Sequence, residues 1–378
     1  MDFGIFYEIQ VNSPLKHRER EAEVFHQVLD QVVAAEEAGF NNFWSVEHHF
    51  QPGFSHSSAP EVLYGALSQR TSRIRIGHAV VLLPFPYNHP VRVAERIATL
   101  DILSKGRVEV GTGRSGTIQE LGGFGIPPEE TRPRWEEALR LLVNIWTSKE
   151  GTFSWKGKYF DIPERSIVPL PVQKPHPPLW LACSNEETHK IAGRMGLGLL
   201  TLVVMVGPEE VARRINLYRD ALKEVKPVGS FVNNRTAVFY MVHCADTDKE
   251  ARENAERGFM SYVNTIFTVS GQLQAAVKEG TRDVPLRAGA NLPPGVSAQE
   301  VNMDYLLRNR TVICGSPDTC IEQVEHIQKV TGLDHMMCMQ QFWSIPHEKV
   351  MKSIRLFGEH VIPHFARQNG AAHAGASH

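Results

Sequence analysis

The sequence is poor in cysteine and has no excess of charge of either sign. Its cysteines number five, an odd count, and no Cys-x-x-Cys pair occurs among them. A disulfide framework does not fit this pattern, and we expect reduced thiols in the core of a cytoplasmic protein. Forty basic residues stand against 42 acidic ones without a basic block. This balance gives no reason to expect nucleic acid or an anionic membrane as a partner.

The chain also has no long apolar run and no basic leader. The longest apolar run, roughly residues 196–207, is too short to cross a bilayer. The first residues, MDFGIFYEIQ, carry two acids and indicate a strand rather than a signal peptide. Its 378 residues are 42% hydrophobic, which is enough for a large buried core. We therefore expect one domain over residues 1–368 and a disordered tail over residues 369–378.

Strand-like and helix-like patterns alternate eight times along the chain. Such alternation predicts a parallel sheet in an α/β protein, and eight units favour a closed (β/α)8 TIM barrel. Two insertions interrupt the rhythm, a hairpin near residues 151–165 and a lid-like segment over residues 264–310. The strand-like stretches are DFGIFYEI, FNNFWSVE, RIRIGHAVVLL, GRVEVGTGR, PPLWLAC, GLLTLVV, TAVFYMVHC and LDHMMCMQQF. Active sites of such barrels lie at the carboxyl ends of the strands.

The fourth strand ends in EVGTGRSG, where three glycines have the G-x-G-x-x-G spacing of a dinucleotide-binding turn. A Rossmann turn follows the first strand and opens a helix at once, whereas this stretch follows the fourth strand. Paired prolines also stand between it and the next convincing helix. Two interpretations remain: flexible loop glycines, or a site in which Arg114 pairs with a phosphate group.

The second strand ends in Glu47-His48-His49-Phe50. Adjacent strand residues face opposite sides, so the two histidines do not form a metal pair on an ideal strand. No second His/Asp cluster stands out, and we predict no metal. A histidine here suits general acid–base chemistry, because its ordinary pKa is ~6.5. Structural histidines held by loop carbonyls are the alternative.

Several segments in order across nearly the whole chain give it a family resemblance. They are DFGIF, AEEAGFNNFWSVEHHF, the run from IGHAVVLLPFPYNHP to GTGRSG, PPLWLACSNEETHKIAGRMGLG and HVIPHF. With them the chain resembles the bacterial luciferase-like flavin-dependent monooxygenases. The resemblance implies a (β/α)8 barrel that binds FMN at its strand ends. Reduced FMN and dioxygen would then form a flavin hydroperoxide, which inserts one oxygen atom into a small organic substrate.

The resemblance also implies roles for residues of the matching motifs. His48 matches the catalytic histidine, and Ala79-Val80 matches a third-strand bulge that carries a non-proline cis peptide bond under the flavin. Arg114 matches the arginine that contacts the FMN phosphate, and Ser184 begins a second phosphate-binding segment at a helix start. The residues expected to bind the cofactor are Glu47, Ala79, Val80, Arg114, Ser184, Asn185 and Thr188.

The sequence departs from the luciferase pattern at two places. Gly113 stands where luciferase has a reactive cysteine, and NEET follows Ser184 where the luciferase pattern is richer in Ser and Thr. A like charge beside the phosphate would be unfavourable, so Glu186 and Glu187 should point away from it. Light emission and aldehyde specificity are therefore not implied for this chain.

Four aromatic residues at strand ends could line a substrate pocket, namely Phe6, Tyr7, Phe50 and Phe342. Core packing is the equal alternative for them. If they line the pocket, they favour an apolar or aromatic substrate. The segment 264–310 and the loop 51–59 are candidate lids that would exclude water.

The expected function is that of the oxygenase of a two-component system. A separate flavin reductase would supply reduced FMN, because the glycine motif lacks the context of a nicotinamide-binding turn. By analogy with the family we expect a homodimer or higher homo-oligomer. The alternatives are a deazaflavin-dependent hydride-transfer oxidoreductase on the same barrel and a non-catalytic flavin-binding protein.

Overall fold

Eight parallel strands close into a barrel, which confirms the predicted fold. The computed structural model describes residues 1–11, 18–202, 204–276, 292 and 296–366. Around the barrel the strand order is β1-β2-β3-β4-β7-β8-β9-β11, and β11 returns to β1. The barrel strands are β1 (Asp2–Tyr7), β2 (Asn42–Ser45), β3 (Arg75–Leu82), β4 (Val108–Gly113), β7 (Leu179–Cys183), β8 (Gly198–Thr201), β9 (Thr236–Cys244) and β11 (His335–Met339).

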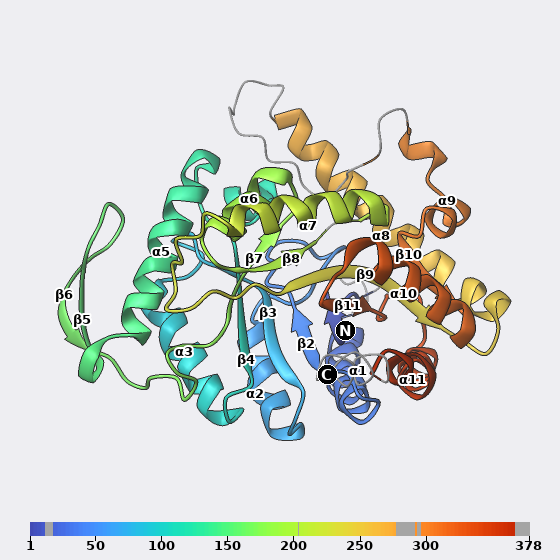
Figure 1. Cartoon of the computed structure of the whole chain (residues 1–378), viewed down its shortest axis with the longest axis horizontal. Helices are drawn as coiled ribbons and strands as arrows, with labels where there is room; N and C mark the ends of the chain where they lie inside the picture. The colour runs from blue at the N-terminus through green and yellow to red at the C-terminus, as the bar shows by residue number, and fades with distance from the viewer. Residues whose placement is uncertain (12–17, 203, 277–291, 293–295, 367–378) are drawn as a thin grey trace, which may run out of the picture.

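Helices surround the strands, as Figure 1 shows. Proline at the first turn starts α2, α3, α7 and α10, where its missing N–H has no partner to lose. The helices are α1 (Glu19–Glu37), α2 (Pro60–Arg70), α3 (Pro90–Leu103), α4 (Ile118–Gly123), α5 (Thr131–Trp146), α6 (Glu186–Arg194), α7 (Pro208–Leu222), α8 (Asp248–Ala276), α9 (Met303–Arg308), α10 (Pro317–Thr331) and α11 (His347–Leu356). None of these described helices is both long and apolar enough to cross a membrane.

Two tryptophans fill the barrel interior. The Trp44 and Trp180 rings meet edge to face at 5.5 Å, and both are almost fully buried. Trp44 donates its indole N–H to His335, and Trp180 donates to the carboxylate of Glu109 at 2.7 Å. A Cβ at Gly77 would lie 2.1 Å from the Trp44 ring, so this strand position has room only for hydrogen. These contacts make the barrel a packed core rather than a pore.

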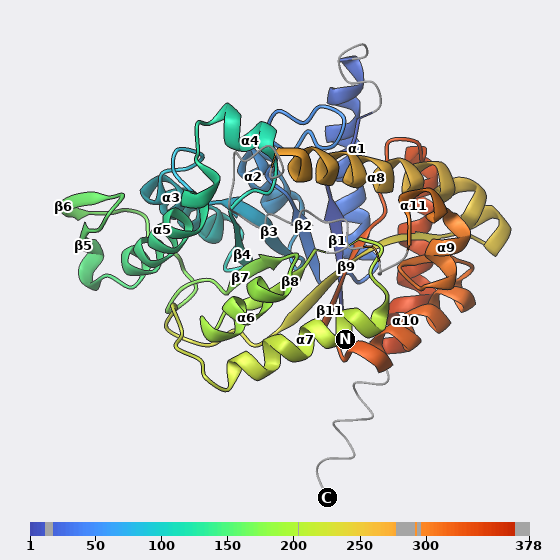
Figure 2. The same cartoon turned by 90° about the horizontal axis from the view of Figure 1, so that it is seen from above.

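The predicted hairpin is present and projects from the barrel in both views (Figures 1 and 2). It consists of the antiparallel strands β5 (Thr152–Lys156) and β6 (Asp161–Ser166). The Glu137 carboxylate of α5 accepts backbone N–H groups of residues 158–160 at 3.0–3.1 Å. It also accepts the indole N–H of Trp155. One carboxylate therefore ties the turn of the hairpin to the barrel.

The lid-like segment predicted for residues 264–310 differs in the structure. Residues 264–276 continue α8 as a regular helix, so the prediction of a loop is wrong there. The helix includes Gly271, which lies on an open face where a Cβ would meet nothing within 4 Å. Residues 277–291 and 293–295 lie outside the described residues, as does the tail predicted to be disordered. Further on, α9 is a short helix.

A ninth strand, β10 (Val312–Gly315), was not expected from the sequence. It pairs with the end of β9, at Met241–Cys244, beyond the residues that β9 shares with β8. The strand β9 is nine residues long and serves both pairings. Four residues between a helix and a Ser-Pro helix start are too few to show a strand period in the sequence.

Candidate active site

A cavity of about 240 Å³ opens at the carboxyl ends of the barrel strands. Its walls come from the ends of β1, β2, β3, β4 and β7, from β9, and from one face of α8. In Figure 2, α8 crosses the same end of the molecule as α4. The residues Tyr262, Ile266, Val269 and Ser270 of α8 line the cavity at helical spacing. The structure thus puts a helix where the sequence suggested a lid.

The structure brings together all the residues predicted to bind the cofactor. These residues line the one cavity together with the predicted catalytic His48 and with Phe6. The residues that were predicted from the sequence and that line this cavity are Phe6, Glu47, His48, Ala79, Val80, Arg114, Ser184, Asn185 and Thr188. They come from five strand ends that are far apart in the sequence.

His48 lies against a buried carboxylate. Its Nδ1 is 2.8 Å from Oε1 of Glu120, a residue of α4 that is fully buried. Burial alone would lower the His48 pKa, but the Glu120 charge and hydrogen bond outweigh it and raise the pKa to about 9. His48 is therefore an imidazolium at neutral pH, with Nε2 on the side away from Glu120.

Glu120 is the fixed negative charge of this end of the cavity. Besides His48, it accepts the backbone N–H of His49 at 2.9 Å and the hydroxyl groups of Ser115 and Thr117. Burial would raise its pKa, but His48 and these donors together lower it to about 2. Glu120 thus stays ionised and holds His48 in its protonated state.

Glu8 follows β1 and approaches His48 from the other side. Its Oε2 lies 3.9 Å from Nε2 of His48, and its Oε1 accepts the Tyr262 hydroxyl at 3.2 Å. Burial, the largest effect, raises the Glu8 pKa to about 7, against the lowering effects of His48 and Tyr262. The cavity therefore holds a carboxyl group that changes its charge near neutral pH.

Glu47 supports the third-strand bulge. One of its oxygens accepts the Leu82 N–H at 2.8 Å, and the other accepts Asn88 at 2.9 Å and faces His49 at 3.1 Å. Both oxygens are thus engaged by protein donors, although the side chain lines the cavity. Glu47 therefore holds the cavity wall in place and has no free oxygen for a ligand.

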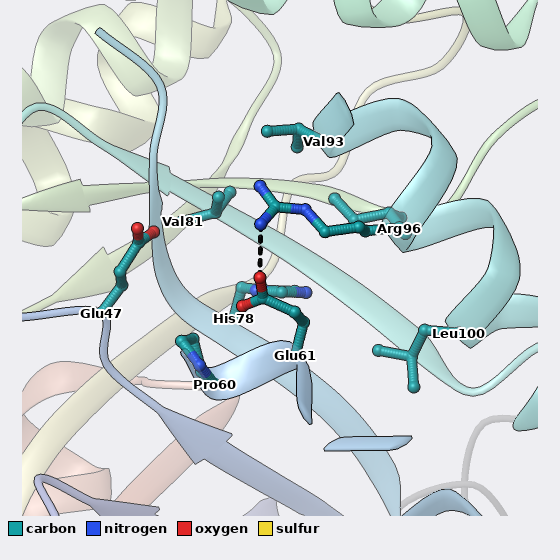
Figure 3. A pocket seen from close by; sticks show the side chains of 9 residues that line it. Glu47, Pro60, Glu61, His78, Val81, Val93, Arg96 and Leu100 are labelled. Carbon is teal, nitrogen blue, oxygen red and sulfur yellow. Dashed lines mark hydrogen bonds and ion pairs between the residues drawn. The ribbon is translucent and has the colours of Figure 1, made fainter. Parts of the chain in front are cut away.

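The back of this wall is closed by charged helix residues. A second cavity, of only about 10 Å³, is lined by Arg96 of α3, Glu61 of α2 and His78. Figure 3 shows Arg96 paired with Glu61 beside His78. Arg96 also donates to the amide oxygen of Asn88. Burial and the Arg96 charge lower the His78 pKa to about 3, so this histidine is neutral. The volume is too small for a cofactor.

The third strand carries the irregularity that the resemblance implies. The Ala79–Val80 peptide bond is cis, and the pairing of β3 with β4 shifts register between His78 and Val81. Ala79 and Val80 both line the cavity. A Cβ at Gly113 would lie 2.3 Å from a Val80 methyl group. A side chain at position 113 would therefore require Val80 to move.

A cation and a helix start meet at the other end of the cavity. Arg114 is half-buried, donates to the Thr131 hydroxyl at 3.2 Å, and has no carboxylate within 4.0 Å among the described residues. Burial, with Arg132 nearby, lowers its pKa to about 10, so it remains charged at neutral pH. Asn185 caps α6 by accepting the Thr188 N–H at 3.0 Å. This combination suits an anionic group such as a phosphate.

The two acids at the start of α6 turn away from this end, as expected. Glu186 pairs with Arg213 at 2.6 Å, and Glu187 lies 3.7 Å from Arg194. Both carboxylates are half exposed, and neither lines the cavity. No charge of these two carboxylates therefore faces Arg114 in the cavity.

Three of the four predicted pocket aromatics lie elsewhere, and we correct the prediction for them. Tyr7 follows Phe6 in the same strand and so faces the opposite side, where it packs on Phe43. Phe342 packs behind Tyr262 against α8. Phe50 is 58% exposed and rests on Phe124 outside the cavity.

Other aromatic residues form the apolar wall instead. Phe6 packs on Phe239 of β9, Phe239 on Tyr262 of α8, and Tyr262 on Phe54, with ring centroids 5.0–6.0 Å apart. Phe54 comes from the loop 51–59, which had been a candidate lid. Phe239 occupies the middle of an uninterrupted apolar strand, where the sequence has no sign of a pocket position.

The residues present fit FMN. Arg114 and the start of α6 would receive the phosphate, and the Ala79–Val80 bulge offers an apolar wall for the ring. His48 lines the same cavity, with Nε2 3.9 Å from Glu8. Within the described part of the chain, no group of three or more His, Cys, Asp or Glu side chains is placed to hold a metal ion.

Comparison with known proteins places these features in a wider group. A family model described as luciferase-like monooxygenase matches residues 1–335. Limonene 1,2-monooxygenase from Rhodococcus erythropolis is 26% identical, over 97% of this chain and 87% of its own length. An F420-dependent glucose-6-phosphate dehydrogenase from Amycolatopsis mediterranei is 25% identical, over 89% of this chain and 93% of its own.

A solved structure agrees over the full length. Monooxygenase RslO1 from Streptomyces bottropensis superposes with a TM-score of 0.77 at 26% identity, over 97% of this chain and 100% of its own. The similarity therefore extends over the whole barrel.

Proposed function

Because the chain belongs to the luciferase-like monooxygenase family, we propose that it is an FMN-dependent monooxygenase acting on a small organic substrate. One atom of dioxygen is placed on the substrate and the other leaves as water. The observation that supports this most is the single cavity that joins Arg114 and the α6 start to the protonated His48 and an apolar wall.

The binding of FMN is assigned to residues at one end of the cavity. Arg114 and backbone N–H groups at the start of α6 hold the phosphate, because a helix start offers N–H groups without helical partners. Ala79 and Val80 support the ring, and Glu47 keeps their strand in place. When bound, reduced FMN supplies the two electrons that the use of dioxygen requires.

The protein's own part in the reaction is to exclude water and to hold protons. Ile266, Val269 and Phe54 cover the cavity with apolar side chains, and a dry cavity suppresses unproductive loss of reducing equivalents. His48 carries its proton on the nitrogen that faces Glu8, where it can hydrogen-bond to oxygen atoms that gain negative charge. Glu120 keeps that proton in place.

A separate reductase is part of the proposal. The G-x-G-x-x-G stretch lies at the end of β4, and its Gly113 packs against Val80 instead of opening the first βα turn of an open sheet. The described residues therefore have no nicotinamide-binding turn of that type, and reduced FMN has to arrive from another protein.

We also propose a homodimer, because α2 and α3 expose Val62, Ile102 and Leu103 to solvent.

Deazaflavin-dependent hydride transfer is the second candidate. It is supported by the 25% identity to an F420-dependent dehydrogenase over most of both chains. The third possibility, a flavin-binding protein without catalysis, gains no support, because the cavity keeps Glu8, His48 and Glu120 together.

Titration with reduced FMN and with a deazaflavin separates these candidates. For the proposed function, reduced FMN binds more tightly and dioxygen uptake follows. Arg114→Ala should weaken FMN binding about 10- to 100-fold, the size of a charged hydrogen bond, while Arg114→Lys keeps part of the affinity. Arg140→Ala is the control, since Arg140 is an exposed cation of α5.

Two results would contradict the proposal. Unchanged FMN affinity in Arg114→Ala would remove the phosphate assignment. Tighter binding of the deazaflavin, with substrate-dependent hydride transfer and no dioxygen uptake, would favour the second candidate.

A further inference from the structure

The Glu8 carboxyl group has one oxygen that accepts no hydrogen bond from the described residues, although Nε2 of His48 lies 3.9 Å from it. Its residue is only 3% exposed, Oε1 accepts the Tyr262 hydroxyl, and Oε2 has no hydrogen-bond partner among the described residues. Glu8 lines the cavity, and the strand alternation that turns Tyr7 outward turns Phe6 and Glu8 inward. A buried carboxyl oxygen without a partner is unfavourable, so this position is suited to a ligand group that donates a hydrogen bond.

The surroundings of Glu8 limit what that ligand can be. The connected rings of Phe6, Phe239, Tyr262 and Phe54 form the adjacent wall, and Ile266 and Val269 of α8 extend it. Such a wall favours an apolar molecule of about the size of one aromatic ring. Glu8 and His48 are the charged groups of this part of the cavity, and of the two only Glu8 can accept a hydrogen bond from a ligand when His48 is protonated.

We propose that Glu8 is a catalytic base that takes the proton of a phenolic hydroxyl group on the substrate. The proposal rests on the monooxygenase function above and names its substrate class, an otherwise apolar aromatic compound that carries one such hydroxyl on the ring. In the step, the substrate O–H bond breaks, the proton moves to Oε2 of Glu8, and the electron pair stays on the substrate oxygen. The ring becomes richer in electrons, which favours attack on an electrophilic oxygen atom.

The charges around the cavity assign this role to Glu8 rather than to His48. His48 is already protonated at neutral pH through its contact with Glu120, so it cannot accept a further proton. The titratable groups that face Glu8 are His48 at the β2 end, Glu120 of α4 and Tyr262 of α8. Burial against these groups leaves the Glu8 pKa at about 7, close to the value that suits a base at neutral pH.

Binding of a matched pair of probes to the FMN-free protein tests the donor requirement. The probes are 4-propylphenol and its methyl ether, which differ only in the O–H donor. We expect the wild-type protein to bind the phenol about 10- to 100-fold more tightly, as for a hydrogen bond to a charged group. Glu8→Leu should abolish this preference, whereas Glu23→Gln, an exposed carboxyl of α1, should keep it. Equal affinities in the wild type, or a preference that persists in Glu8→Leu, would overturn the proposal.

The pH profile of the loaded enzyme tests the proton transfer. With 4-propylphenol, kcat/KM should rise with pH through the Glu8 pKa, and Glu8→Gln should lose this limb. Tyr262→Phe keeps the ring but removes a hydrogen bond that lowers the Glu8 pKa, so the limb should move to higher pH. A limb that stays in place in both variants would show that another group is the base. If wild-type protein binds the phenol selectively but never takes up dioxygen with reduced FMN, the monooxygenase assignment fails and the Glu8 site stands.

Discussion

The His48 imidazolium and the Glu120 carboxylate form a buried ion pair with a defined pH window. The His48 pKa is raised to about 9 from 6.5, so its contribution to stability is complete below 6.5 and is lost as the pH rises through 9. The Glu120 pKa is lowered to about 2 from 4.5, so its contribution is complete above 4.5 and is lost as the pH falls through 2. Both contributions are complete only between pH 4.5 and 6.5.

Removal of the Glu120 charge should destabilise the protein within that window. We expect Glu120→Gln to lower the free energy of unfolding by about 2–3 kcal/mol, because buried donors lose a charged acceptor. The His48 pKa should also fall, since burial then acts against only the weaker charges of Glu8 and Glu47. Urea unfolding at several pH values and NMR titration of the imidazole measure the two effects.

The matched control is the double variant His48→Gln with Glu120→Gln. The coupling energy from the cycle should be largest between pH 4.5 and 6.5 and should shrink towards pH 9. A stability difference that does not change with pH would contradict the ion-pair account.

Sequence patterns identified some of the cavity's residues and not others. His48 and Arg114 could be found because each ends a strand within a polar run. Glu120 could not, because its partner lies 72 residues away and the pairing exists only in three dimensions. Glu8 carried a usable signal, an acid directly after an apolar strand at the carboxyl end of a barrel strand, where function is expected.

Among the secondary-structure elements, the hairpin β5–β6 depends on one side chain of α5. Glu137 receives the backbone N–H groups of residues 158–160, and the described strands pair mainly with each other. A two-stranded hairpin of this kind is only marginally stable alone. The carboxylate is therefore expected to determine whether the hairpin stays docked.

Glu137→Ala should loosen the hairpin without unfolding the barrel. Amide hydrogen exchange at residues 158–160 should become faster and tryptic cleavage after Lys156 or Lys158 easier, while the global unfolding transition shifts little. Glu129→Ala is the control, since Glu129 is exposed on a neighbouring turn. Unchanged exchange at residues 158–160 would show that packing alone holds the hairpin.

The length of α8 illustrates what periodicity misses at this scale. Gly271 and the glycines and prolines beyond it suggested a loop, yet the helix extends to Ala276. Its cavity face is stabilised by tertiary packing of Tyr262 and Ile266 over the barrel mouth, which outweighs the low helix propensity of a single glycine. The eight barrel strands, by contrast, are short stretches with buried apolar residues between helix-like segments, and all of them were found.

For the whole molecule, the exposed apolar side chains on α2 and α3 bear on assembly. Val62 is 72% exposed on α2, and Leu103 is exposed on α3. If two copies pair through this face, Val62→Arg should convert the dimer to a monomer, because a charge would be buried without a partner. Light scattering after size exclusion measures the mass. Val168→Arg is the control, since Val168 is 82% exposed in the segment after the hairpin. A monomeric wild type, or a dimer that survives Val62→Arg, would contradict this assignment.

The barrel could be predicted from the sequence, because eight alternating strand and helix patterns in a chain of this length are compatible with few architectures. The closing contacts did not, since β11 meets β1 and β9 by pairing that no local pattern records. The cavity could not be predicted from local patterns either, because it forms only when closure of the barrel brings the strand ends together.

The position of β11 between β1 and β9 has a consequence for synthesis in the cell. A ribosome delivers β1 first and β11 last among the barrel strands, so β1 keeps an unpaired edge until His335–Met339 has emerged. Free edges pair with other strands, and such long-range closure is slow. The growing chain is therefore most prone to aggregate just before its last barrel strand arrives.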